Sequence, residues 1–252
     1  MQNRFTAAVA AAALLTAVTA QTQAAEIVVF GTVAAKAALA QIVPAYEHAT
    51  GNKVVLRTAT TGELQDAIAR GATVDVAILS KSALDDLSGK GKLDGASLMM
   101  VAKSGIGVAV KQGAPMPAIG TADEFKRSLL DARSIAYTAQ GASGVQLQKI
   151  FAQYQITDAL RAKTVLIHKG TAPEAVGRGE AELALTQISE ILAAAPAAQL
   201  VGPLPPGVQV YSVFGAEIAT ATKEQQAARA FMAALTSPSA KASLTSTGLE
   251  TN

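Results

Sequence analysis

The sequence predicts an α/β protein of two lobes with a cleft between them. Short apolar strand-like segments alternate with amphipathic helix-like segments, which is typical of βαβ units on a mostly parallel sheet. Two passages rich in proline and glycine, 104–117 and 201–207, divide this alternation into two sets. Because the chain after the second passage returns to the first set, we expect lobe 1 to hold 26–107 plus 208–252, and lobe 2 to hold 108–207.

The N-terminal segment has the pattern of a secretory signal. Arg4 is followed by an apolar stretch, Ala7–Val18, and then by small residues up to Glu26. We therefore expect residues 1–25 to be a signal peptide and the protein to act in the periplasm. No other window approaches the roughly 18 apolar residues of a spanning helix, so no membrane insertion is expected.

The segments expected in lobe 1 follow from spacing and from turn residues. Leu39, Ile42, Val43 and Tyr46 recur at helical spacing, and Pro44 among them predicts a kink or a restart of that helix. Apolar runs bounded by glycine predict the strands. The strands expected are 26–32, 52–59 and 74–80, and the helices end near 51, 71 and 89.

Lobe 2 repeats the alternation, and two helices complete the chain. Leu147, Ile150 and Phe151 lie on one face of a helix that we expect over 143–156. The other segments expected there are helices 121–132 and 171–181 and strands 104–111, 133–139, 162–168 and 182–187. A strand within 207–218 and helices 223–237 and 238–248 then return to lobe 1.

Composition excludes several classes of function. The chain has 252 residues, a net charge of only +2 and no basic run, so nucleic-acid binding is not expected. It has no cysteine and two histidines, which argues against disulfides, thiolate catalysis and a zinc site. Nucleotide and hydrolase motifs are missing, and no metal or cofactor is expected. Aromatic residues make up 4% of the chain, which disfavours a carbohydrate ligand.

Several helix starts share one device, the capping box, in which a Thr or Ser is followed three residues later by Glu or Gln. The pairs are Thr60 with Glu63, Thr121 with Glu124, Thr171 with Glu174, and Ser143 with Gln146. Each is by itself an ordinary helix start. However, those at Thr60, Ser143 and Thr171 follow expected strands, and so does the turn after Gly31. In an open α/β sheet these turns point amides and hydroxyls into one cleft, which favours an anion.

The chain resembles the periplasmic molybdate-binding proteins of the type II solute-binding superfamily. The matching segments are "IVVFGTVAAKAALAQIVPAYEHATGNKVV", "TTGELQDAIARGATVDVAILS", "GRGEAELALTQISEI" and "AARAFMAALTSPSAKASLTSTGLE". The resemblance implies the two-lobed type II periplasmic binding protein fold, closing over a small anion held by hydroxyls and amides. It also implies that an ABC-type permease is a candidate partner, and a monomer is expected.

The resemblance carries over ligand by ligand to positions in both lobes. The hydroxyl of the first turn falls at Thr32 and that of the second at Thr60 or Thr61. The turns of the second lobe fall at 141–143, with Ser143, and at 169–171, with Lys169 and Thr171. A tyrosine common in molybdate binders falls at Gln187. A Gln amide near Arg57 and Lys169 suits a carboxylate better than a tetrahedral metal oxyanion.

Two functions remain open. The first is a transport receptor for a small anion, either a polycarboxylate or an oxyanion such as molybdate. The second is a cofactor-independent aconitate isomerase, because the superfamily includes aconitate isomerases, which move a double bond by proton transfer next to carboxylates.

Each candidate side chain for the isomerase also has a structural alternative. His168 is the candidate base, or a loop histidine that binds backbone. Arg57 and the two lysines, Lys36 and Lys169, could hold carboxylates or be solvated. Tyr137 could donate a proton or pack as a ring. Asp75 is expected to be a structural acceptor, and His48 a surface residue.

Overall fold

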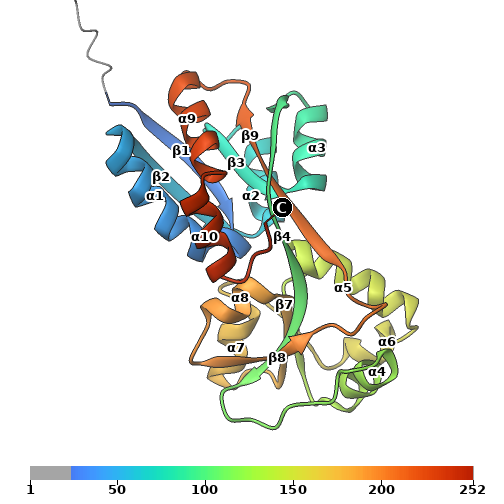
Figure 1. Ribbon diagram of the computed structural model, residues 1–252. Helices are drawn as coiled ribbons and strands as arrows, with labels where there is room; N and C mark the ends of the chain where they lie inside the picture. Colours follow the sequence, from blue (N-terminus) through green and yellow to red (C-terminus); the bar gives the residue numbers. More distant parts are fainter. Residues whose placement is uncertain (1–23, 252) are drawn as a thin grey trace, which may run out of the picture.

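The computed structural model describes residues 24–251, and the predicted signal peptide lies almost wholly outside them. Two lobes are stacked end to end (Figure 1). The first lobe contains β1 (Glu26–Thr32), η1 (Val33–Ala35), α1 (Lys36–Thr50), β2 (Lys53–Ala59), α2 (Thr61–Ala69), β3 (Val76–Ser80), α3 (Lys81–Gly89), β9 (Tyr211–Ala219), α9 (Gln225–Leu235) and α10 (Pro238–Ser246). The second contains α4 (Ala122–Asp131), β5 (Ile135–Tyr137), α5 (Ala142–Gln153), α6 (Thr157–Arg161), β6 (Thr164–Leu166), α7 (Ala172–Arg178), β7 (Leu183–Gln187), α8 (Ile188–Ala193) and β8 (Ala198–Pro203).

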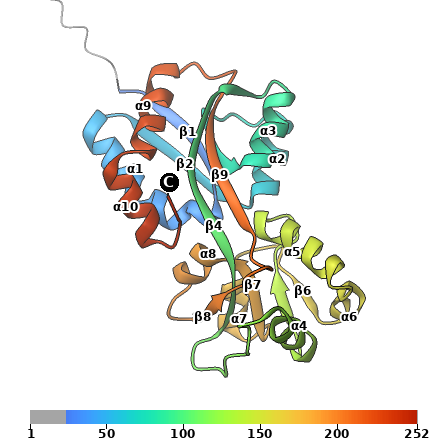
Figure 2. The same ribbon diagram turned by 45° about the vertical axis from the view of Figure 1, so that its right-hand side comes forward.

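One long strand, β4 (Leu93–Lys111), belongs to both lobes (Figure 2). Its first part pairs with β9 as far as Gly105, and its last part, from Ile106 onward, pairs with β7 and β8. The strand order is β2-β1-β3-β9-β4-β7-β5-β6, with β8 beside β4. The expected crossing at 104–117 is therefore the continuation of a strand that begins eleven residues earlier than the sequence suggested.

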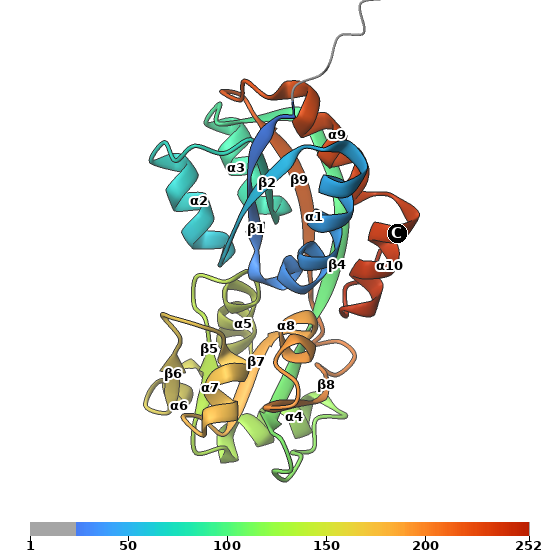
Figure 3. The same cartoon turned by 90° about the vertical axis from the view of Figure 1, so that its left-hand side faces the viewer.

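Helices cover both faces of the sheet in each lobe, which explains why the central strands are apolar throughout. In the first lobe α1, α9 and α10 pack on one face, while α2 and α3 pack on the other (Figure 3). In the second lobe α4, α5 and α6 enclose one cluster, and α7 and α8 contribute to another. The separate clusters agree with two lobes, and the expected boundaries at 107 and 207 stay a prediction.

The expectation of a mostly parallel sheet is only half right. β1 pairs in parallel with β2 and β3, and β5 with β6 and β7. All pairings of β4 and β9 are antiparallel. The sequence analysis also missed α6, α8 and β8, which are only five or six residues long.

Two local features, a restart of the first helix at Pro44 and a cap at Ser143, are not present in the structure. The first helix does not restart at Pro44, because α1 runs without a break from Lys36 to Thr50. Proline has no amide proton for the Ala40 carbonyl, and because Ala40 and Pro44 are both exposed, this carbonyl is accessible to solvent. Ser143 does not cap its helix either: α5 begins at Ala142 with Gly141 as its N-cap. The other three capping boxes are confirmed.

Candidate functional site

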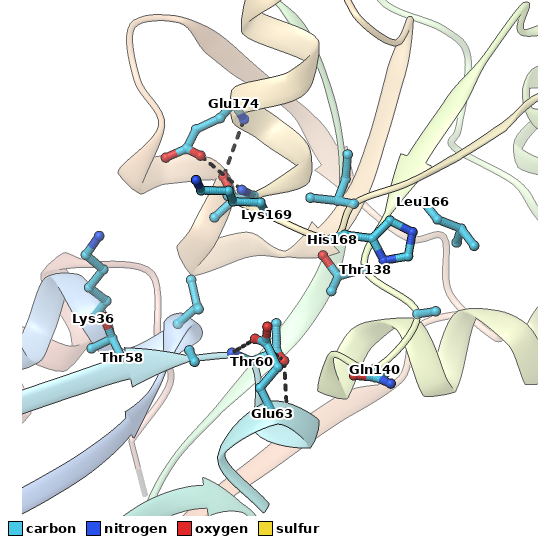
Figure 4. A pocket seen from close by; sticks show the side chains of 16 residues that line it. Lys36, Thr58, Thr60, Glu63, Thr138, Gln140, Leu166, His168, Lys169 and Glu174 are labelled. Carbon is cyan, nitrogen blue, oxygen red and sulfur yellow. Dashed lines mark hydrogen bonds between the residues drawn. The ribbon is translucent and has the colours of Figure 1, made fainter. Parts of the chain in front are cut away.

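A cavity of about 430 Å³ lies between the lobes (Figure 4), and we call it the outer cavity. The first lobe contributes the end of β2 and the starts of α1 and α2. The second contributes the loops before α5 and α7. The outer cavity is lined by Val33, Lys36, Thr58, Ala59, Thr60, Glu63, Thr138, Ala139, Gln140, Leu166, Ile167, His168, Lys169, Gly170, Thr171 and Glu174.

A smaller pocket of about 20 Å³, the inner cavity, shares five of these residues. It is lined mainly by hydroxyl side chains, small residues and one carboxyl group. Its lining consists of Thr32, Val33, Ala34, Thr60, Thr61, Thr138, Gly141, Ala142, Ser143, Gly170, Thr171, Thr186, Gln187 and Glu190. Six of the eight ligand residues proposed from the sequence therefore lie around one small space: Thr32, Thr60, Thr61, Ser143, Thr171 and Gln187.

The hydroxyl groups of the first lobe are not equally free to bind a ligand. Thr61 donates its hydroxyl proton to Thr32 Oγ1 at 3.3 Å. Thr60 accepts from the Glu63 amide at 3.3 Å and donates to the Glu63 carboxylate at 2.7 Å. The Thr32 residue is 4% exposed. Its hydroxyl accepts from Thr61 but donates to no described residue. Thr32 is thus the best-placed donor from this lobe.

In the second lobe, Thr171 is also a free donor. Its Oγ1 accepts from the Glu174 amide at 3.4 Å, and the Glu174 carboxylate accepts from the Thr171 amide at 3.0 Å. Within the part of the chain that the structure describes, no acceptor takes the Thr171 hydroxyl proton. The capping carboxylates of Glu63 and Glu174 occupy the N-cap amides, so hydroxyls rather than these amides remain for an anion.

Gln187 is held by the protein itself. The side chain is 1% exposed. With its amide oriented so that donors meet acceptors, it donates to the Ser104 carbonyl at 3.0 Å and accepts from the Ser212 hydroxyl at 2.6 Å and the Ser143 amide at 3.2 Å. These bonds link β7 to both long strands and to α5. They leave Gln187 as a residue that fixes the start of α5 rather than a free amide facing a carboxylate.

Three cationic or titratable groups from the sequence analysis lie at the outer cavity. Lys36, His168 and Lys169 are exposed and come from both sides of it (Figure 4). Such groups can attract and hold carboxylates. The outer cavity therefore holds the lysines of the cleft, together with the carboxylates of Glu63 and Glu174.

Two other candidates lie elsewhere. Arg57 is exposed on β2, with its guanidinium 5.8 Å from the centre of the Phe30 ring, and it does not line the outer cavity. The lining takes only the last two residues of β2, Thr58 and Ala59, and ends before Arg57. Tyr137 packs edge-to-face on Phe151 at 5.7 Å, and burial raises its pKa.

The expectations for Asp75 and His48 are confirmed. Asp75 accepts hydrogen bonds from the Val28 amide and the Thr222 hydroxyl, as a structural acceptor does. His48 is exposed near the end of α1.

Glu190, the carboxyl group of the inner cavity, was not predicted from the sequence. It lies in the first turn of α8, three residues after β7 ends. Burial raises its pKa from 4.5 to about 7, and the hydrogen bond from Thr186, at 3.0 Å, offsets part of that effect. An acidic residue just after a buried strand was the available signal, but the short helix α8 was not expected.

The lobes touch beside the cavity. The Gly62 amide of α2 donates to the Gln140 carbonyl at 3.1 Å. A Cβ at Gly62 would lie 2.7 Å from that carbonyl oxygen, so only glycine permits this approach. The contact fixes the separation of Thr61 from the start of α5.

Among residues 24–251, no helix has both the length and the apolar character needed to cross a membrane. A family model described as "Bacterial extracellular solute-binding protein" matches residues 27–250. An aconitate isomerase from Pseudomonas sp. is 35% identical over 216 residues, which cover 83% of this chain and 82% of that protein.

Solved structures share the fold at lower identity. The periplasmic molybdate-binding protein of Azotobacter vinelandii gives a TM-score of 0.76 at 21% identity, covering 90% of this chain and 99% of that one. The sulfate-binding protein SubI of Mycobacterium tuberculosis gives 0.75 at 16%, covering 89% and 86%. At these identities the likeness shows the two-lobed fold alone.

Proposed function

The chain belongs to the family of bacterial extracellular solute-binding proteins, and from this premise we propose that it is a periplasmic isomerase of aconitate. The protein would bind the tricarboxylate in the cleft and move its double bond between the cis and trans forms. The observation that carries this proposal is the relative named aconitate isomerase, whose 35% identity extends over most of both chains.

The geometry of the cleft supports a polycarboxylate. The outer cavity, at about 430 Å³, lies in the range of about 300–1,000 Å³ typical of pockets for small organic ligands. Lys36, His168 and Lys169 around it offer separate partners for separate carboxylates. Thr32 and Thr171 offer hydroxyl donors at its inner end. A ligand with several carboxylates matches this distribution better than one compact anion.

A receptor for an oxyanion is the second candidate. The inner cavity is small, lined by hydroxyls and free of cationic side chains, as suits a compact anion held by neutral donors. Such a receptor would hand its ligand to an ABC-type permease. Two residues proposed as ligands from the sequence are disfavoured for either candidate. Arg57 lines neither cavity, and the Gln187 amide is already bonded within the protein.

One assay distinguishes the isomerase from the oxyanion receptor. Purified protein is incubated with trans-aconitate without added metal, and proton NMR follows the appearance of cis-aconitate. We expect turnover. If trans-aconitate is unchanged while molybdate raises the melting temperature, the receptor is the correct function.

A further inference from the structure

We infer that Glu190 is the catalytic acid and base that moves the proton between two carbons of the bound tricarboxylate. This inference rests on the proposed function. Of the residues that line the inner cavity, Glu190 alone carries a titratable side chain. The hydroxyl-bearing residues whose protons are free for a ligand, Thr32 and Thr171, line the same cavity.

A hydrogen-bonded relay holds the carboxyl group in place. Ser143 and Thr186 hydroxyls are 3.3 Å apart, and Thr186 donates to Glu190 Oε2 at 3.0 Å. Because the Thr186 hydroxyl donates its proton to Glu190, Ser143 must be the donor in the Ser143–Thr186 hydrogen bond. The other carboxyl oxygen of Glu190, Oε1, forms no hydrogen bond with a described residue. It remains available for a proton of the ligand.

One carboxylate is sufficient for this reaction. Ionised Glu190 takes a proton from the methylene carbon of trans-aconitate, and the electron pair of the broken C–H bond becomes part of a delocalised allylic anion. The protonated Glu190 then gives a proton to the carbon at the other end of that allylic system, and the double bond is left one position along. The proton taken equals the proton returned, so no oxidant, reductant or cofactor enters the balance.

The charges around Glu190 leave it free to exchange a proton near neutral pH. The elements packed against α8 are β4, β7, β8 and η1, and the last three carry no titratable side chain. On β4, Lys103 is paired with Glu250, and Asp94 and Lys111 lie near the two ends of the strand. Burial is the leading cause of the raised pKa, so ionised Glu190 is a stronger base than an exposed glutamate.

The charged groups of the outer cavity have a different role. Lys36, His168 and Lys169 are exposed there, together with the carboxylates Glu63 and Glu174, which are held in capping boxes. The cations would hold the carboxylates of the ligand, while its reacting carbons face Glu190. His168 is then a binding residue, not the base.

The test compares Glu190→Gln with Glu217→Gln. Glu217 is the control because it accepts from a serine hydroxyl, as Glu190 accepts from a threonine hydroxyl, has a pKa raised by burial, and lies outside both cavities. We expect Glu190→Gln to lower kcat at least 100-fold, the scale of general acid–base catalysis, and Glu217→Gln to leave it unchanged. Binding is measured with propane-1,2,3-tricarboxylate, which has no double bond to move. The Kd of both variants should stay within about threefold of the wild type at pH 6, where Glu190 is mostly protonated.

Further variants and a pH profile keep the result interpretable. Glu190→Asp retains a carboxylate and should recover part of kcat, and wild-type kcat should rise as pH increases through the pKa of Glu190. The inference is overturned if Glu190→Gln keeps the kcat of the wild type. It is also overturned if His168→Asn abolishes turnover while Glu190→Gln does not. If the wild type itself does not turn over trans-aconitate, the proposed function fails first, and the two failures are distinguishable.

Discussion

Replacing Glu190 with glutamine is expected to stabilise the folded protein by up to about 3 kcal/mol at pH 8.5 and to change its stability little at pH 4.5. The pKa of this carboxyl group is raised from 4.5 to about 7 in the folded protein, chiefly by burial. One pKa unit corresponds to about 1.4 kcal/mol, and because the side chain is half-buried, about 3 kcal/mol is the upper limit of the cost of keeping it ionised.

The sign follows from proton binding. Below pH 4.5 the carboxyl group is protonated in both the folded and the unfolded chain, and it does not change stability with pH. Between pH 4.5 and 7 the folded chain keeps a proton that the unfolded chain has lost, so stability falls as pH rises. Glutamine is neutral at every pH in this range, and its amide oxygen still accepts from Thr186. The variant therefore does not lose stability as the pH rises.

Urea denaturation of both proteins at pH 4.5 and 8.5 measures this difference. Glu182→Gln is a control with the opposite sign, because hydrogen bonds from Arg133, first its amide and then its side chain, lower the pKa of Glu182. That variant should lose stability at pH 8.5 relative to the wild type. A Glu190→Gln protein that is no more stable than the wild type at pH 8.5 would show that Glu190 is not buried in its ionised form.

Replacing Thr32 with valine is expected to weaken the binding of propane-1,2,3-tricarboxylate by about 10- to 100-fold. Valine has nearly the volume of threonine, so the change removes a donor without opening a cavity. A hydrogen bond to a charged group is worth about 1.5–3 kcal/mol, which gives the expected range. Thr32 makes no capping bond, and its loss should leave η1 and α1 in place.

Isothermal titration calorimetry at fixed pH and salt measures this effect. Thr220→Val is the matched control: its hydroxyl donates to the carbonyls of Gly91 and Lys92, on a loop of the same lobe that lines neither cavity. It should change stability slightly and affinity not at all. Equal affinities for the wild type and Thr32→Val would remove this hydroxyl from the ligand set.

The sequence predicted the fold well where its patterns were long. Helices of nine or more residues with capping boxes, such as the one after Thr60, and buried strands such as 76–80 were placed within a few residues. Missed segments were short, because five or six residues contain too little periodicity. The antiparallel direction of β4 and β9 was not predicted, for another reason. The direction of a strand relative to its neighbours depends on which strands it pairs with, and β4 pairs in both lobes.

The hydroxyls of the candidate site and the lysines of its outer cavity were predictable, whereas the place of Arg57 and the presence of Glu190 were not. Turns at Thr32, Thr60, Ser143 and Thr171 converge because parallel strands bring their carboxyl ends to one edge. The direction of Arg57 depends on a one-residue register along an edge strand. The carboxyl group of Glu190 depends on a six-residue helix and on burial, neither of which the local sequence specifies.

The central claim is that an anion is held between the lobes by hydroxyls that come from both of them. A crystal structure of the protein soaked with propane-1,2,3-tricarboxylate tests it most directly. The account predicts ligand density within hydrogen-bond distance of Thr32 and Thr171, with at least one carboxylate toward Lys36 or Lys169. Density on another surface, with an empty cleft at saturating ligand, would contradict it.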